Sequence, residues 1–76
     1  MDKRSLTIGR HRTSVALEPA FWEALGEIAA ARGLAISQLI AEIDRTRAPG
    51  GLASALRVYV LDHYRRPAGS DAPASA

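Results

Sequence analysis

The sequence contains no cysteine, so it can form neither a disulfide framework nor a thiolate metal site. It has no apolar run close to the roughly 20 residues that a membrane-spanning helix needs. Its first residues also lack the apolar core of a signal peptide. We therefore expect no membrane segment and a location in the reducing cytoplasm.

Residue types that commonly carry catalysis are also scarce. The chain has two histidines, His11 and His63, and neither belongs to a metal-binding or nucleophilic motif. A core built from so few residues leaves little room for a ligand pocket of ordinary volume. We expect no enzymatic activity, no metal and no cofactor.

The chain is short for an independently stable domain. Of its 76 residues, the last ten, PAGSDAPASA (67–76), are small and polar and predict a disordered tail. A chain of this length buries only about 60% of its unfolded surface and usually needs a disulfide, a metal or a second subunit. Since cysteine is lacking and no metal site is evident, we expect a homodimer.

Positive charge gathers at the front of the chain. The net charge is +2, but the first twelve residues hold four basic side chains against one acidic one, whereas the rest is slightly acidic. The basic residues are Lys3, Arg4, Arg10 and Arg12. This asymmetry favours an anionic partner, nucleic acid before membrane headgroups.

Residues 10–17, RHRTSVAL, alternate in the manner of a β-strand with one buried face. Val15 and Leu17, with Thr13, would pack against the helices that follow. Arg10, Arg12 and Ser14 would point outward. The sequence thus predicts one short strand at the front of a mainly helical chain.

The predicted strand needs a partner, because a single strand leaves its backbone donors and acceptors unpaired. Antiparallel pairing with a second copy about a two-fold axis near Ser14 would satisfy them. A hairpin is the alternative: the apolar phase changes across Gly9, and a type II′ turn at Gly9-Arg10 would pair residues 5–8 with 11–14. Both arrangements stay open at this point.

Three helices are predicted, over residues 19–32, 37–47 and 52–65. Pro19 favours a first helical turn and Gly33 a left-handed end. Ser37 is a candidate cap for the second helix, and APGG, 48–51, separates it from the third. The third helix is apolar nearly all round, which indicates burial against a second chain.

The order of these pieces in RTSVALEPAFWEALGEIAAARGLAISQLIAEI, residues 12–43, resembles the ribbon-helix-helix family, to which the Arc and MetJ repressors belong. The third helix is similar to an elaboration in short bacterial members. The resemblance implies an intertwined homodimer with a two-stranded antiparallel intermolecular ribbon in the domain 10–66, preceded by a basic arm, 1–9. It also implies a DNA-binding transcriptional regulator, a repressor, whose ribbon enters the major groove of double-stranded DNA.

The resemblance further implies roles for individual residues. The outward ribbon positions that contact bases match Arg12, Ser14 and Ala16, although alanine can contact only a thymine methyl. Phosphates would be held by the start of the second helix, Ile36, Ser37 and Gln38, and by the basic arm, Lys3, Arg4 and Arg10. The dimer core would comprise Val15, Leu17, Leu39, Ile40, Ile43, Leu56 and Val60.

Two other functions compete with this hypothesis. A helix-turn-helix around Gly33 would place the second helix in the groove, but that helix exposes Glu42 and Asp44 beside its arginines. An antitoxin-like or adaptor dimer would instead bind a partner protein through the third helix and the tail. Salt-dependent affinity for DNA would favour the ribbon hypothesis over this second one.

Overall fold

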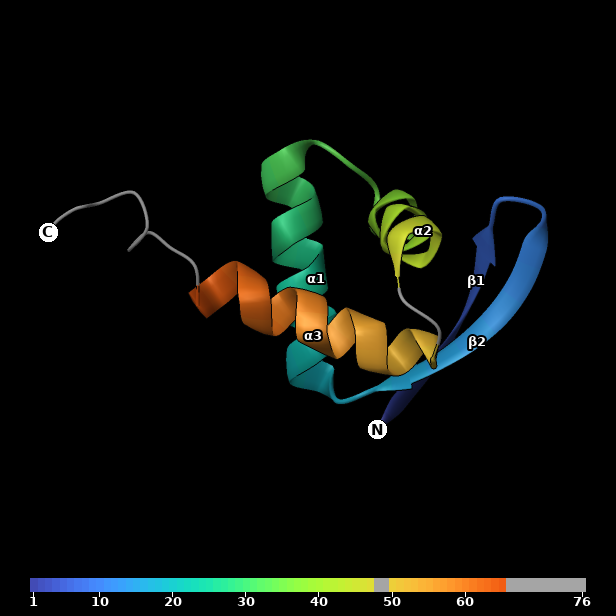
Figure 1. The fold of residues 1–76 in the computed structure, drawn as a ribbon, viewed down its shortest axis with the longest axis horizontal. Helices are drawn as coiled ribbons and strands as arrows, with labels where there is room; N and C mark the ends of the chain where they lie inside the picture. The colour runs from blue at the N-terminus through green and yellow to red at the C-terminus, as the bar shows by residue number, and fades with distance from the viewer. Residues whose placement is uncertain (48–49, 66–76) are drawn as a thin grey trace, which may run out of the picture.

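The computed structural model describes residues 1–47 and 50–65 as a β-hairpin followed by three helices (Figure 1). The elements are β1 (Asp2–Ile8), β2 (His11–Leu17), α1 (Pro19–Arg32), α2 (Ile36–Thr46) and α3 (Leu52–Arg65). The tail predicted over 67–76 and part of the break predicted at 48–51 lie outside the described residues.

The strand predicted from the sequence is β2, and its partner lies in the same chain. β1 pairs with β2 antiparallel, with Ser5 opposite Ser14 and Ile8 opposite His11. Of the two arrangements that the sequence left open, the structure therefore has the hairpin, in the register expected for it. Residues 1–9, expected as a basic arm that could be part strand, contain β1 over most of their length. Their backbone supplies the ladder that β2 needs.

Gly9 makes the tight turn between the strands possible. Its φ is +61°, whereas Arg10 after it keeps a negative φ. A glycine with positive φ at the first central position fits the type II′ turn expected here, whose twist matches that of the flanking strands. Arg10, predicted as the first residue of the strand, lies in this turn.

Local signals explain how the first two helices are delimited. Pro19 opens α1, and Gly33, at φ +72°, ends it while Leu34 N–H donates to the Ala29 carbonyl over 2.8 Å. α2 begins at Ile36, one residue before the predicted start, and ends at Thr46. Ser37 is not its cap, because the Gln38 side chain accepts a hydrogen bond from the Ala35 N–H over 2.7 Å and Ala35 takes the cap position.

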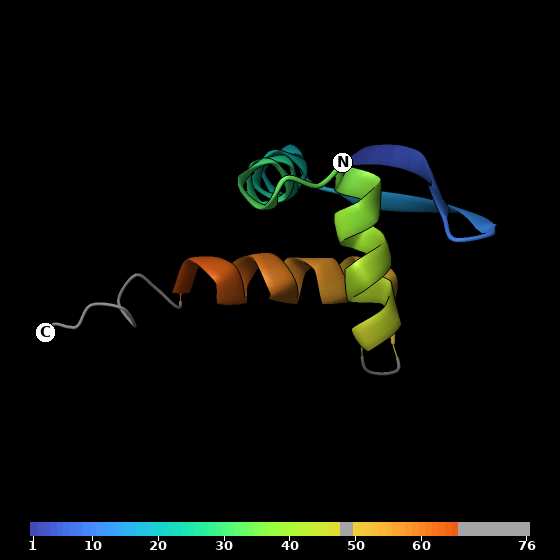
Figure 2. The same ribbon diagram turned by 90° about the horizontal axis from the view of Figure 1, so that it is seen from above.

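The core lies where the inner face of the hairpin meets the three helices. Two views show α1 and α3 in separate layers, with α2 beside them running from one layer to the other, while the turn of the hairpin extends beyond the helices (Figures 1 and 2). All seven residues predicted for the dimer core are already buried within the single chain: Val15, Leu17, Leu39, Ile40, Ile43, Leu56 and Val60. Their participation in a dimer stays a prediction.

Trp22 fastens the first strand to α1. Its ring is 2% exposed, and its Nε1–H donates to the Asp2 carbonyl over 2.9 Å. The guanidinium carbon of Arg4 lies 4.5 Å from the ring centroid, within the range of a cation–π contact. The beginning of β1 is therefore held by side chains as well as by the ladder.

The Gly9 turn gives a direct test of the hairpin. Gly9→Ala should lower the free energy of unfolding by about 1–2 kcal/mol, because alanine is strained at positive φ. The matched control is Gly26→Ala inside α1, where alanine should be neutral or stabilise by about 0.5–1 kcal/mol. An added Cβ meets nothing within 4 Å at either glycine, so steric contact does not enter the comparison. Urea unfolding of both variants measures the difference, and equal effects would contradict this account of the turn.

Candidate nucleic-acid interface

The hairpin has one face turned to the helices and one turned to solvent. Side chains alternate along each strand, and directly paired residues share a face. Ile8, Val15 and Leu17 are 8%, 4% and 0% exposed, so they mark the inner face. The opposite side, here called the ribbon face, comprises Lys3, Ser5, Thr7, Arg12, Ser14 and Ala16.

The ribbon face is built from cations and hydroxyls. Lys3 pairs with Ala16, Ser5 with Ser14 and Thr7 with Arg12, and five of these six side chains are exposed. None of the six is a carboxylate. In the part of the chain that the structure describes, no hydrogen bond or ion pair joins these side chains to other protein groups. Their donors are therefore available to an external ligand.

The three residues predicted to contact bases lie together on this face. Arg12 and Ser14 are exposed, whereas Ala16 is half-buried. Ala16 lies nearest the helices, at the end of the hairpin away from the turn. The geometry thus brings Arg12 and Ser14 to the accessible part of the ribbon and leaves Ala16 at its edge.

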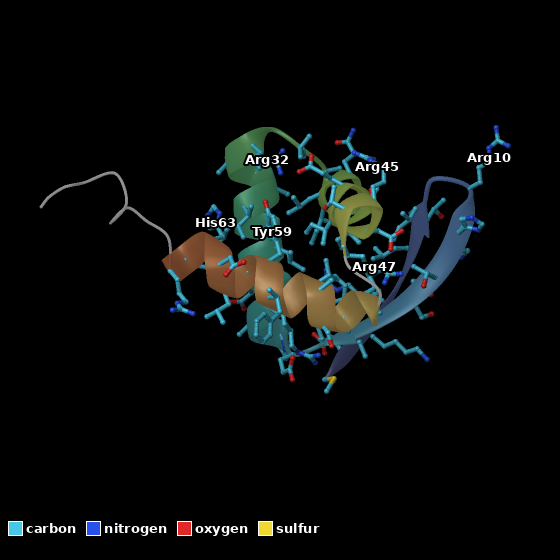
Figure 3. The ribbon with its side chains drawn as sticks, in the orientation of Figure 1. Arg10, Arg32, Arg45, Arg47, Tyr59 and His63 are labelled. Atoms are coloured by element: carbon cyan, nitrogen blue, oxygen red, sulfur yellow. The ribbon has the colours of Figure 1, made fainter. Side chains whose placement is uncertain are left out.

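The basic residues predicted for the arm, Lys3, Arg4 and Arg10, lie at three different places in the structure. Lys3 lies on the ribbon face opposite Ala16. Arg10 projects from the turn, away from the body of the protein (Figure 3). Arg4 belongs to the inner side, where it stacks on Trp22, so it packs β1 onto α1. Lys3 and Arg10 remain placed to contact an anion beside the ribbon.

Sequence reasoning missed Ser5 and Thr7 as ribbon-face residues. The resemblance assigns phosphate contacts to the basic residues of the segment 1–9 and no role to these two hydroxyls. The signal was present in the alternation of SLTI, in which Leu6 and Ile8 take the inner positions and Ser5 and Thr7 the outer ones. Only the pairing of the strands shows that these residues share a face with Arg12 and Ser14.

The start of α2 retains backbone donors. Within residues 1–47 and 50–65, the structure gives the N–H groups of Ile36 and Ser37 no acceptor, as is usual in a first helical turn. The Gln38 N–H instead donates to the Ala35 carbonyl over 3.0 Å, and its side chain is engaged with the Ala35 N–H. The phosphate-binding role expected for these three residues stays a prediction.

The acidic side chains of α2 are held in ion pairs. Arg32 donates to Glu42 over 2.7 Å and 3.0 Å, and Arg47 donates to Asp44 over 2.8 Å. Hydrogen bonding from Arg32 lowers the pKa of Glu42 and, in turn, raises the pKa of the Arg32 guanidinium. Figure 3 shows Arg32 and Tyr59 on the same side of the helices, and the Tyr59 hydroxyl lies 3.4 Å from Arg32 Nη1. The Arg32 contacts join α1 to α2 and α3, whereas the pair of Arg47 with Asp44 is local to the end of α2. The acidic side chains thus lie beside the arginines here, unlike on the ribbon face.

The described residues offer neither a metal cluster nor a single helix fit to cross a membrane. Within them, no group of three or more histidine or acidic side chains is placed to hold a metal ion. None of the three helices by itself has the length and apolar composition to cross a membrane; α1 and α2 meet that test only as a pair, and they are bent by 97°.

Comparison with known proteins identifies a domain family. The family model described as a ribbon-helix-helix domain matches residues 1–64, which include both strands and nearly all of α3. Comparison with curated proteins and with solved structures gives no match. The family match extends well beyond the 12–43 segment that carries the resemblance in the sequence.

The pH dependence of stability tests the contact between Arg32 and Glu42. Since the folded pKa of Glu42 is lowered, its stabilising contribution is present above the unfolded value, about 4.3, and is lost as pH falls through the folded pKa. Glu42→Gln should therefore lower Tm slightly near pH 7, and the difference from the wild type should vanish in stronger acid. The effect is small because both side chains are partly exposed. Glu23→Gln on the exposed side of α1 is the control, and a difference that does not shrink at all as pH falls below the unfolded pKa would contradict this assignment.

Proposed function

The chain belongs to the ribbon-helix-helix family of DNA-binding regulators, and on that premise we propose that it is a sequence-specific transcriptional repressor acting through the ribbon face. The observation that supports this proposal is the composition of that face. It presents exposed hydroxyls and cations without a carboxylate, on a two-stranded element that extends beyond the helices. A protein of this family typically has no enzymatic activity, in line with the sequence-based expectation.

The dimensions and chemistry of the ribbon match the major groove of B-DNA. That groove admits a two-stranded β-ribbon, and arginine can donate two hydrogen bonds to guanine there. Arg12 would make this contact, Ser14 would bond to a base edge, and Ala16 would touch a thymine methyl group. Arg12 carries most of the expected discrimination between bases, since it alone of the three can donate two bonds in parallel.

Phosphate contacts would position the ribbon in the groove. Lys3 lies on the ribbon face and Arg10 at the tip of the ribbon. At the start of α2, the N–H groups of Ile36 and Ser37 can donate hydrogen bonds to an anion, with Gln38 completing that turn. Such contacts release counterions from DNA, so affinity should fall steeply with salt concentration. Binding to chromosomal DNA would place the protein in the cytoplasm of a bacterial cell.

Ribbon-helix-helix proteins typically form dimers, and we extend this to the present chain through α3. β2 already pairs with β1 of the same chain. The argument that β2 needs a second copy to supply its pairing partner therefore no longer applies. An apolar stripe on α3 supplies a different argument: Val58, Leu61 and Tyr64 are 57%, 52% and 55% exposed. A homodimer that buries this stripe would compensate for the small core of the single chain.

The same surface supports a second candidate function, an antitoxin-like or adaptor dimer. Val58, Leu61 and Tyr64, together with Phe21, Arg57 and Val60, line an apolar groove of about 300 Å³ between α1 and α3. A partner protein could occupy it in addition to DNA on the ribbon, because the two surfaces belong to different elements. The part of this hypothesis that involves the tail concerns residues outside those described.

Comparison of two arginine variants tests DNA binding through the ribbon. Arg12→Ala should weaken binding to a selected duplex by about 1–3 kcal/mol, because it removes a donor to base edges. Arg45→Ala, an exposed position on α2, should leave affinity nearly unchanged. Fluorescence anisotropy at two salt concentrations measures both variants. Loss with Arg45→Ala alone would favour a helix-turn-helix and overturn the ribbon proposal.

Mass in solution tests the dimer. Light scattering of the full chain should give twice the monomer mass, and Leu61→Asp should shift the mass toward the monomer, because a carboxylate would be buried in the apolar contact. Glu23→Gln, exposed on α1, should leave the mass unchanged. A wild-type protein that remains monomeric at high concentration would overturn the homodimer and leave the stripe on α3 to a different protein.

A further inference from the structure

We infer that β1 contributes base contacts of its own, so that each chain carries a complete and asymmetric DNA-recognition ribbon in which Ser5 and Thr7 determine specificity together with Arg12 and Ser14. This inference rests on the proposed DNA-binding function and deepens it. It assigns roles to residues that the resemblance in the sequence leaves out, and it changes the symmetry of the expected target.

The register places the β1 side chains where recognition would occur. Thr7 lies directly opposite Arg12, and Ser5 lies directly opposite Ser14. Side chains opposed in this way stand about 5 Å apart at their Cβ atoms. A ligand that reaches Arg12 from outside therefore meets Thr7 at the same level of the ribbon.

The register cannot shift without exposing the core. A slip of one residue would turn Ile8, 8% exposed, to solvent and bring a polar neighbour inward. The Gly9 turn fixes the same alignment from the other end, because its two central residues leave no length to spare. Ser5 and Thr7 are thus held on the ribbon face by the packing of the opposite side.

Their chemistry suits base edges. Each hydroxyl can donate and accept a hydrogen bond, and both side chains are exposed, with no hydrogen bond to the protein within residues 1–47 and 50–65. Serine and threonine can bond to several base edges, and the threonine methyl group can contact the methyl of thymine. Thr7 beside Arg12 would therefore recognise a base pair next to the one that Arg12 contacts.

The two strands have different side chains, so the ribbon has no internal two-fold symmetry. Thr7 faces Arg12, whereas a ribbon made from two copies of β2 about an axis near Ser14 would present the same residues on both strands. The site contacted by one ribbon should accordingly be non-palindromic. In a dimer, two such sites would be separated by about one helical turn of DNA or a multiple of it.

The experiment begins with selection of duplexes from a randomised library by the full-length protein. The base preference of the selected site is then measured for the wild type, Arg12→Ala, Ser5→Ala and Thr7→Val. The matched control is Thr13→Val, the same substitution in the same hairpin, at a half-buried position on the inner face opposite Leu6. Circular dichroism melting of every variant establishes that the hairpin and helices are retained.

Thr7→Val and Ser5→Ala should each reduce the preference at one base pair by about 2- to 10-fold, the range of a single hydrogen bond. Thr13→Val should leave every preference unchanged. If Arg12→Ala alters the preference but neither β1 substitution does, DNA binding by the ribbon stands and the role of β1 is overturned. A selected site that is palindromic at the centre of a single ribbon would also overturn it. If no duplex is enriched, or if Arg12→Ala changes nothing, the proposed function itself fails.

Discussion

Antiparallel pairing between β1 and β2 is the constraint on which the other features depend. A short strand beside three helices would leave one row of backbone donors and acceptors without partners, and residues 2–8 supply that row within the same chain. The pairing in turn fixes which side chains face the core. Trp22 reinforces this arrangement by bonding the backbone of Asp2 and stacking on Arg4. The position of every ribbon-face residue follows from this one alignment.

The two faces of the hairpin require different kinds of side chain. On the inner face, Ile8, Val15 and Leu17 must be apolar, because they meet the helices. On the outer face, the same alternation leaves side chains exposed, so their identity is little restricted by packing. Ion pairs occupy the acidic groups of α2, while the ribbon carries cations next to hydroxyls. Core packing and the proposed DNA contacts therefore fall on alternate positions of the same two strands.

Helix positions were accessible from the sequence because their signals are local. Pro19 and Gly33 act within a single turn of chain, and the structure has α1 between them. Ser37 shows where a local signal misleads: serine is a common cap, yet the Gln38 side chain bonds the Ala35 N–H and α2 starts earlier.

The partner of β2 was harder to predict than the strand itself. Alternation shows which residues share a face of one strand, but it does not specify which segment supplies the neighbouring backbone. For this reason Arg12 and Ser14 could be singled out from the alternation of β2 alone. Ser5 and Thr7 join the same face only if the hairpin is chosen, and the sequence left the hairpin open beside the pairing of two copies.

The hairpin also affects the order of folding and association. The most distant pair in its ladder, Asp2 with Leu17, is close along the chain, so closing it costs little loop entropy. Hairpins of this kind form in about 1–10 μs, far faster than two dilute chains meet. The hairpin is therefore expected to form within each chain before a second copy arrives.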